Sequence, residues 1–314
     1  MTATTAVTVR VPAKVNLKLA VGPAREDGYH DLVNVFHAVA LFDEVTVREP
    51  RTRAPRGAVR LTVDGDLDSH TARVPLDGTN LAARAARLVA REAGCDDPIE
   101  LHLRKRIPVA GGMAGGSADA AGALVACDTY FGAGLPPERL RALAADLGSD
   151  VAFPLVGGTA VGTGRGEVLA PVDSPGRYHW VFALAEGGLS TADVFAEYDR
   201  LRPDAPPPAD DPGLRAALAA GDPVRVGAAL ANDLEPAALS LRPALAGVLA
   251  AGRAAGALGA VVSGSGPTCA FLAASADAAA GVAAALDASG RCARTVVAHG
   301  DVEGARVVAP AAGG

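Results

Sequence analysis

The chain has 314 residues, a formal net charge of −6 and a pI near 5.5, and 50% of its residues are hydrophobic. This composition excludes a largely disordered chain and suffices for one large domain or two ordinary ones. The acidic balance argues against nucleic acid as the default partner. The chain shows neither a basic start followed by an apolar stretch nor a run of about eighteen uncharged apolar residues. We therefore expect a cytoplasmic protein that has no signal peptide and does not enter a membrane.

Hydrophobic periodicity predicts mixed strands and helices in the first third of the chain. Alternating apolar residues over 7–19 indicate a strand that carries Lys14, Asn16 and Lys18 on the face opposite the valines. The further elements expected here are a second segment over 32–47, a helix over 81–92 that Asn80 caps, and a strand over 99–103.

The remainder of the chain predicts more helices, which glycine-rich turns separate. A helix is expected from Ser117, with one apolar stripe along it, and another opens at Pro136-Pro137 and ends at Gly148. Turns are expected over 157–166 and 263–267, a loop or linker over 202–213, and a frayed tail after 308. This mixture indicates an α+β protein in two lobes.

Two residue types are used unusually. Arginine outnumbers lysine 26 to three, so Lys14, Lys18 and Lys105 are candidates for roles that a guanidinium cannot fill, with chance as the alternative.

The four cysteines form no C-x-x-C pair and have no histidine at metal-ligand spacing. We expect reduced, buried thiols.

The segment 108–119 is the strongest candidate for chemistry. It places four glycines in six residues between a strand and a helix, where backbone N–H groups and the helix dipole can hold a phosphate. No lysine follows its last glycine and it is not G-x-G-x-x-G, so it is neither a P-loop nor a dinucleotide fingerprint. A glycine-rich turn that packs tightly against a neighbour is the alternative.

The other candidates each have an ordinary structural alternative. Lys14 and Asn16 can face an anion or belong to an exposed strand face. Asp150 can act as a general base or cap the next turn. Tyr29 and His30 can recognise a base or cover the core, and 263–268 can close over a phosphate.

Taken together and in this order, these segments resemble the GHMP kinase superfamily. The resemblance covers about 9–297 and rests on Pro12-Ala-Lys-Val-Asn-Leu17, on the glycine-rich segment from Pro108 and on Ser263-Gly-Ser-Gly-Pro-Thr268. It implies an α+β, two-lobed GHMP-kinase-like fold, with an ATP lobe of the ribosomal-S5-domain-2-like type and a ferredoxin-like C-terminal lobe. The implied division is an ATP-binding and catalytic domain over 1–170, a substrate domain over 171–308 and a flexible tail over 309–314.

Three further segments resemble the members that act on a cytidine-diphosphate-linked substrate: Asp27-Gly-Tyr-His30, Gly148-Ser-Asp-Val151 and Asn232-Asp-Leu-Glu235. The implied reaction is Mg²⁺-assisted phosphoryl transfer from ATP to the 2-hydroxyl of its methylerythritol part, in the non-mevalonate route to isoprenoid precursors. A mevalonate- or homoserine-type substrate is the alternative within the superfamily. A nucleotide-binding regulator without catalysis is the alternative outside it, which the presence of both Lys14 and Asp150 disfavours. We expect a monomer or weak homodimer.

The resemblance also implies roles for individual residues. Lys14 and Asp150 would form the catalytic pair. The ATP phosphates would contact Pro108, Val109, Ala110, Gly111, Gly112, Met113, Ala114, Gly115, Gly116, Ser117 and Ala118, with Asn80 and Lys105 also at the nucleotide and Ser117 as a candidate Mg²⁺ ligand. The cytidyl substrate would contact Asn16, Tyr29, His30, Thr191, Phe195, Gly264, Ser265 and Gly266. Its cytosine would stack between Tyr29 and Phe195 and form hydrogen bonds with His30.

This chain departs from the family pattern at a few positions. Ala118 replaces a serine, which removes one hydroxyl contact to phosphate. Ala110 and Ala114 replace glycines, which the backbone tolerates only where φ is negative. Pro154 is shifted from its usual place directly after Asp-Val, which affects the pose of Asp150.

Overall fold

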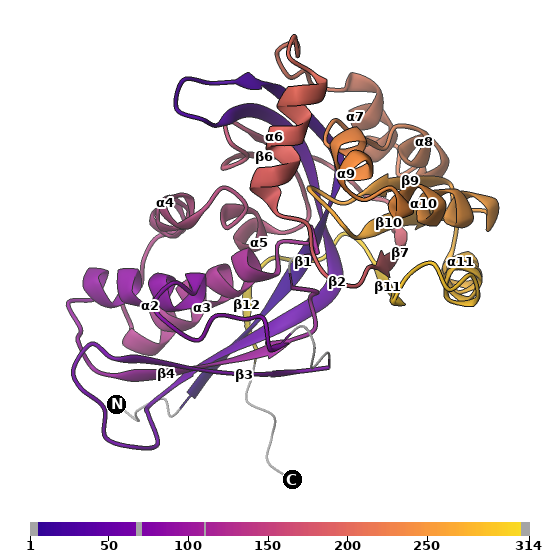
Figure 1. The fold of residues 1–314 in the computed structure, drawn as a ribbon. Helices are drawn as coiled ribbons and strands as arrows, with labels where there is room; N and C mark the ends of the chain where they lie inside the picture. The colour runs from indigo at the N-terminus through magenta and orange to yellow at the C-terminus, as the bar shows by residue number, and fades with distance from the viewer. Residues whose placement is uncertain (1–5, 67–70, 110, 309–314) are drawn as a thin grey trace.

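The computed structural model describes residues 6–66, 71–109 and 111–308. Two long antiparallel strands, β1 (Ala6–Ala24) and β2 (His30–Arg48), run through the molecule from one lobe to the other (Figure 1). Both extend beyond the predicted 7–19 and 32–47, because their ends pair with each other up to Ala24 and His30. The strand pair therefore links the two lobes.

The larger sheet is built on these two strands and follows the order β12-β1-β2-β4-β3. Its other members are β3 (Val59–Gly65), β4 (Ile99–Lys105), β5 (Thr159–Thr163), β6 (Val168–Pro171), β8 (Ala231–Asn232) and β12 (Arg306–Val308). The prediction of a turn over 157–166 was wrong for β5, which pairs with β2 from Asn34 to His37. The glycines that flank a short buried segment concealed this strand.

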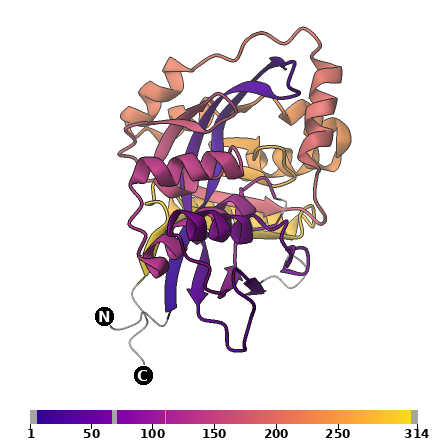
Figure 2. The same cartoon turned by 90° about the vertical axis from the view of Figure 1, so that its left-hand side faces the viewer.

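Helices α2 (Leu81–Glu92), α3 (Gly115–Phe131), α4 (Pro137–Leu147) and α5 (Ala152–Val156) gather beside this sheet (Figures 1 and 2). The predicted single apolar stripe on α3 was wrong, since most of its residues are buried, including Ala118 and Ala121 away from the stripe. Small residues make this possible: a Cβ on Gly122 would lie 2.7 Å from a methyl carbon of Val45. The helix therefore packs directly against the sheet.

The second sheet is antiparallel and has the order β11-β7-β10-β9. Its strands are β7 (His179–Leu184), β9 (Gly259–Val262), β10 (Cys269–Ala273) and β11 (Arg294–His299). The C-terminal half also contains α6 (Thr191–Leu201), α7 (Pro212–Ala219), α8 (Pro223–Ala228), α9 (Glu235–Leu241), α10 (Ala244–Ala254) and α11 (Ala276–Ala288). The predicted loop over 202–213 extends two residues too far, because α7 begins at Pro212.

These two sheets with mixed helices confirm the predicted α+β fold. Late segments return to the first sheet, since β8 and β12 both pair with β1. The division between residues 170 and 171 stays a prediction, and 309–314 lies outside the described residues.

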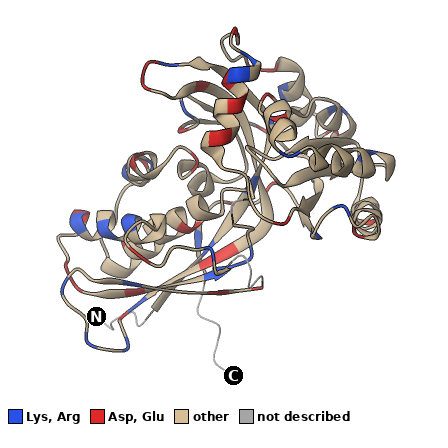
Figure 3. Cartoon of the chain, in the orientation of Figure 1, with Lys and Arg blue, Asp and Glu red and all other residues tan. Residues whose placement is uncertain are grey.

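The four cysteines are free, but the expectation that all are buried was wrong. Cys127 and Cys269 are buried, whereas Cys95 and Cys292 lie half-buried near the surface. Basic and acidic residues are interspersed in the view of Figure 3. Within the described ranges, no helix has both the length and the apolar character needed to cross a bilayer.

Candidate active site

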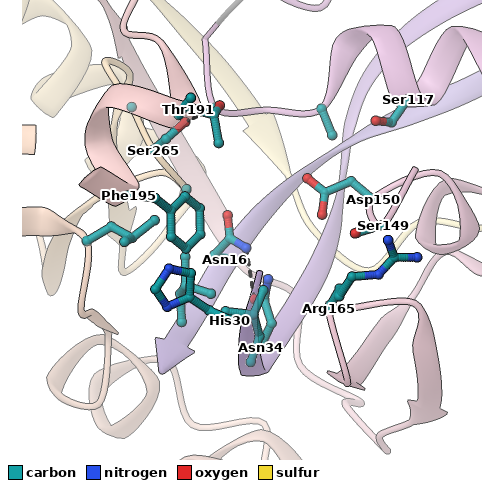
Figure 4. A pocket seen from close by; sticks show the side chains of 18 of the residues that line it. Asn16, His30, Asn34, Ser117, Ser149, Asp150, Arg165, Thr191, Phe195 and Ser265 are labelled. Atoms are coloured by element: carbon teal, nitrogen blue, oxygen red, sulfur yellow. Dashed lines mark hydrogen bonds between the residues drawn. The ribbon is translucent and has the colours of Figure 1, made fainter. Parts of the chain in front are cut away.

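A cavity of about 830 Å³ opens where β1, β2, the start of α3 and α6 meet (Figure 4). It brings together many of the predicted site residues: Lys14, Asn16, Tyr29, His30, Gly111, Gly112, Ala114, Gly115, Gly116, Ser117, Asp150, Thr191, Phe195, Gly264, Ser265 and Gly266. Segments from both halves of the chain thus contribute to one site.

The glycine-rich segment forms one wall of this cavity. Helix α3 begins at Gly115, two residues before the predicted start, and no side chain caps its N-terminus. Gly116 and Ser117 line the cavity at this uncapped end. The first N–H groups of a helix have no partner within the helix, and together with the positive end of its dipole they make this wall suitable for phosphate.

Not every residue of the predicted loop reaches the cavity. Met113 and Ala118 are fully buried in the core, and neither Pro108 nor Val109 lines the cavity. Ala110 lies outside the described residues. The contact of this whole segment with ATP stays a prediction.

Ala114 contradicts the expectation that alanine replaces glycine only where φ is negative. It has φ 59° and ψ 33°, in the left-handed region, directly before α3. For a residue with a Cβ this conformation costs about 1–2 kcal/mol. The chain therefore carries backbone strain at the edge of the cavity.

The two glycine-rich segments pack backbone against backbone. A Cβ on Gly112 would lie 1.9 Å from the carbonyl oxygen of Ser263, and Gly112 has φ 73°. The Ser263 hydroxyl donates to the Gly112 carbonyl at 3.1 Å. Asn232 braces the second segment by donating to the carbonyls of Val262 at 2.8 Å and Gly264 at 2.7 Å. This packing explains why glycine is needed at residue 112.

Lys14 lies on β1 and is 3% exposed, so the alternative of an exposed strand face is wrong. Its ammonium donates to Asn16 Oδ1 at 2.6 Å and lies 3.8 Å from Asp150 Oδ2. Burial lowers the pKa of Lys14, while Asp150 acts in the opposite direction and favours the charged form. The result is a desolvated cation beside a carboxylate.

Asp150 lies between α4 and α5, and its side chain is 39% exposed. The alternative of a helix cap is wrong, because Val151 takes the N-cap position of α5 and no side chain caps this helix. The shifted Pro154 is buried within α5, and the Asp150 carboxylate still reaches Lys14. A carboxylate and a cation therefore lie side by side in the cavity.

The aromatic end of the cavity differs from the predicted sandwich. The His30 ring stacks on Phe195 with centroids 4.9 Å apart and planes inclined by 30°. Its Nδ1–H donates to the Gly22 carbonyl at 2.9 Å, and Nε2 lies 3.6 Å from a carboxylate oxygen of Asp199. Tyr29 is 52% exposed. The His30 ring occupies one face of Phe195, and stacking of a base between Tyr29 and Phe195 stays a prediction.

Polar side chains line the middle of the cavity. Asn16 donates to Asn34 Oδ1 at 2.8 Å, which extends the network from Lys14 across β1 and β2. The hydroxyls of Thr191 and Ser265 lie 3.0 Å apart and join α6 to the 263–267 turn. These groups can recognise hydroxyls or an anionic linker.

Two residues predicted at the nucleotide do not line the cavity. The Asn80 side chain accepts from the Ala82 N–H at 2.8 Å and donates to the Pro75 carbonyl at 2.7 Å, so it caps α2. Lys105 is buried and donates to Asp43, to Asp119 at 2.6 Å and to the Gly115 carbonyl at 3.3 Å. Contact of either residue with a nucleotide stays a prediction. Lys105 supports the start of α3 through the Gly115 carbonyl without itself lining the cavity.

Sequence reasoning missed several lining residues, among them Asn34, Ser149, Arg165 and Asp199. Asn34 shares the predicted 32–47 segment with many apolar neighbours, and Arg165 stands alone between two glycines. Either pattern could have pointed to a site residue, but both also occur commonly at positions that bind no ligand. Among the described residues, no group of three or more His, Cys, Asp and Glu is arranged to hold a metal ion.

Comparison with known proteins gives consistent matches. The family described as GHMP kinases N terminal domain matches residues 80–158, and GHMP kinases C terminal matches 214–292. A 4-diphosphocytidyl-2-C-methyl-D-erythritol kinase of Thermobifida fusca is 68% identical over 308 residues, covering 98% of this chain and 100% of the relative. A solved 4-(cytidine 5'-diphospho)-2C-methyl-D-erythritol kinase has 33% identity and a TM-score of 0.73, covering 94% of this chain and 99% of the other. A homoserine kinase of Cytophaga hutchinsonii has 21% identity and a TM-score of 0.74, covering 98% and 99%, which indicates a shared fold alone.

Proposed function

The chain belongs to the GHMP kinase family, and on that premise we propose that it transfers the γ-phosphoryl group of ATP to the 2-hydroxyl of 4-diphosphocytidyl-2-C-methyl-D-erythritol. This reaction is a step of the non-mevalonate route to isoprenoid precursors. The observation that carries the proposal is the Lys14–Asp150 pair, 3.8 Å apart in a cavity that the uncapped start of α3 also lines. An acceptor alcohol and a phosphate chain can meet there.

The chemistry follows from these positions. Asp150 would accept the proton of the 2-hydroxyl as its oxygen bonds to the γ-phosphorus, and the bond from that phosphorus to the bridging oxygen breaks to release ADP. Lys14 would compensate charge on the transferred group, and its burial strengthens that interaction because little water screens it. Positioning and electrostatics would supply most of the rate enhancement.

The N-terminal end of α3 would bind the ATP phosphates. Gly116 and Ser117 line the cavity in the first turn of α3, where their backbone N–H groups would bind phosphate, and the glycines beside them would let a phosphate chain approach the backbone closely. Lys105 would act through Gly115, whose carbonyl it holds at 3.3 Å, and not by direct contact.

One hydroxyl at this end of the cavity could hold Mg²⁺ together with the phosphates of ATP. Mg²⁺ prefers hard oxygen donors and is commonly held by one or two protein oxygens together with substrate phosphates and water. The Ser117 hydroxyl lines the cavity at the α3 N-terminus and is such a donor. We propose Ser117 as the protein ligand. When bound, the ion would neutralise charge on the phosphates.

The other end of the cavity would read the cytosine. Because the Nδ1–H of His30 donates to Gly22, a neutral His30 ring leaves Nε2 as an acceptor, which suits the exocyclic amino group of cytosine. Tyr29 and Phe195 offer aromatic faces for stacking. Thr191 and Ser265 would contact the linker between base and alcohol.

An ADP-release assay tests the proposal directly. The purified chain is given ATP, Mg²⁺ and, separately, the cytidyl substrate, mevalonate and homoserine, and phosphorus NMR identifies the product. We expect turnover with the cytidyl substrate alone. Preferred turnover of mevalonate or homoserine would overturn the substrate assignment, and no turnover of any alcohol would overturn the proposed reaction.

A variant pair tests the catalytic assignment. Asp150→Asn should lower kcat by roughly 10²–10⁴ while the affinity for ATP changes little, because the amide cannot take the proton. Asp146→Asn on the exposed side of α4 makes the same charge change and should leave kcat unaltered. Near-normal turnover by Asp150→Asn would remove this residue as the proton acceptor.

A further inference from the structure

A short turn over 163–166 presents one arginine at the cavity wall. It joins β5 to β6 and is closed by a hydrogen bond of 3.0 Å from the Gly166 N–H to the carbonyl of the first turn residue. The Leu32 N–H donates to the Gly164 carbonyl at 2.7 Å and ties the turn to β2. Gly164 and Gly166 have φ 70° and 111°, so glycine is needed on both sides of Arg165. The backbone that carries this side chain is therefore held in place.

The Arg165 side chain is oriented by contacts at its backbone N–H and Nε, whereas its two terminal guanidinium nitrogens are available to a ligand. Its backbone N–H donates to Glu167 Oε2 at 2.7 Å, and its Nε lies 3.7 Å from Glu167 Oε1. Its Cζ lies 5.1 Å from the ring centroid of Tyr29. Within the described part of the chain, the two terminal nitrogens have no hydrogen-bond partner. The side chain is 35% exposed and lines the cavity, so these nitrogens can bind a ligand.

The charges that line the cavity indicate which ligand this is. The cationic side chains among the described lining residues are Lys14 and Arg165, and Lys14 is buried beside Asp150. Asp150 and Asp199 are both acidic and would repel an anion. A substrate whose base and alcohol are joined by a diphosphate needs a cation between the two ends. A guanidinium meets phosphate oxygens with two parallel hydrogen bonds, which suits this task.

The position of Arg165 agrees with this requirement. Figure 4 shows Arg165 on the wall that carries Ser149 and Asp150, across from His30 and Phe195. Its contact with Tyr29 places it next to the residues proposed to bind cytosine. Arg165 thus lies beside Tyr29 and on the wall of Asp150, the residues proposed to act at the base and at the reacting hydroxyl.

We propose that Arg165 binds the diphosphate of the cytidyl substrate and makes the enzyme specific for a nucleoside-diphosphate-linked alcohol, an inference that rests on the proposed function. The two glycines fix the backbone of the turn and Glu167 lies beside the guanidinium Nε, so little ordering is needed on binding. The triphosphate of ATP remains at the start of α3.

Kinetics of Arg165→Gln and Arg165→Lys test this proposal. We expect Arg165→Gln to raise KM for the cytidyl substrate about 10–100-fold, with kcat and KM for ATP within about twofold of the wild type. Arg165→Lys keeps the charge but not the fork and should recover part of the loss. Arg56→Gln is the matched control, since Arg56 pairs with Asp96 outside the cavity and its side chain is 80% exposed.

Inhibition by cytidine, CMP and CDP isolates the contribution of the phosphates. In the wild type CDP should bind more tightly than cytidine, and Arg165→Gln should lose most of that difference while the affinity for cytidine stays unchanged. The comparison is made within one variant, so a loss of folded protein cannot imitate it. An unchanged CDP-to-cytidine ratio would overturn the proposal, and so would a fall in kcat with KM unaltered, which would assign Arg165 to the transferred phosphoryl group. Wild-type enzyme that ignores the cytidyl substrate would instead overturn the proposed function.

Discussion

The buried cluster of Asp43, Lys105 and Asp119 predicts an unusual dependence of stability on pH. One ammonium lies between two carboxylates, all nearly or fully excluded from water. Asp43 Oδ1 also accepts the backbone N–H groups of Arg106 and Ile107, whereas Asp119 Oδ1 is buried without a partner. Burial, together with the charge of Asp43, raises the pKa of Asp119 to about 8, so Asp119 takes the proton that balances the cluster.

Whether stability rises or falls with pH depends on how many protons the folded and the unfolded protein bind. Unfolded Asp119 has a pKa near 3.9, so from about pH 4 to pH 8 the folded protein binds one proton more than the unfolded chain, and its stability falls as pH rises. Between pH 5 and pH 7.5 this amounts to about 3 kcal/mol. His37 acts in the opposite sense at lower pH, because burial lowers its pKa to about 3 and its stabilising effect is lost as pH falls below about 6.5. The free energy of unfolding of the wild type, measured against pH, therefore contains the contributions of both Asp119 and His37.

The variant Asp119→Asn separates the contribution of Asp119 from that of His37. The amide cannot titrate, so the free energy of unfolding of the variant relative to wild type should rise by about 3 kcal/mol from pH 5 to pH 7.5, while the His37 contribution cancels. Urea unfolding followed by the fluorescence of Trp180, the single and fully buried tryptophan, measures this difference. Asp204→Asn at an exposed position is the control and should give a parallel profile. A parallel profile for Asp119→Asn as well would show that Lys105 keeps both carboxylates ionised, and the reasoning would fail.

Three further substitutions test the packing around the site. Ala114→Gly should raise the free energy of unfolding by roughly 0.5–1 kcal/mol, because it relieves a left-handed alanine; urea unfolding would measure this, and an unchanged midpoint would argue against the strain. Gly112→Ala should raise KM for ATP at least about tenfold, because its Cβ would meet Ser263 and push the two glycine-rich segments apart. Initial rates at varied ATP concentration measure this KM, and an unchanged value would show that the site tolerates the methyl group. Lys105→Met should destabilise the fold by about 3–5 kcal/mol, since it leaves the buried Asp43 carboxylate without its cation and Asp119 without its hydrogen-bond donor. Lys18→Met removes a partly exposed pair and should cost about 1 kcal/mol or less, and equal losses in thermal unfolding would contradict the cluster's burial.

Local patterns in the sequence predicted much of the site. Period-two alternation predicted the strand that carries Lys14, and the cluster of glycines before an apolar helix predicted the wall formed by 111–117. Such signals arise within a few residues of the chain, and this is why a single sequence reveals them. The resemblance of ordered motifs to the GHMP kinases extended them to the pairing of Lys14 with Asp150.

Other features depend on contacts between segments far apart in the chain. Alternation cannot tell a buried polar face from an exposed one, so the burial of Lys14 follows only once Asp150 and the 263–267 turn close over β1. The left-handed backbone of Ala114 likewise contradicts local preference and persists only because the surrounding structure holds it.

The sequence by itself thus determined most element types, the glycine-rich wall of the cavity and the family. Only the tertiary structure decided that Lys105 supports α3 from behind, that Arg165 joins the cavity, and that His30 covers Phe195. The physical reason is that periodicity and turn chemistry are local, whereas burial, charge balance and the meeting of side chains are set by how the two sheets and their helices pack together.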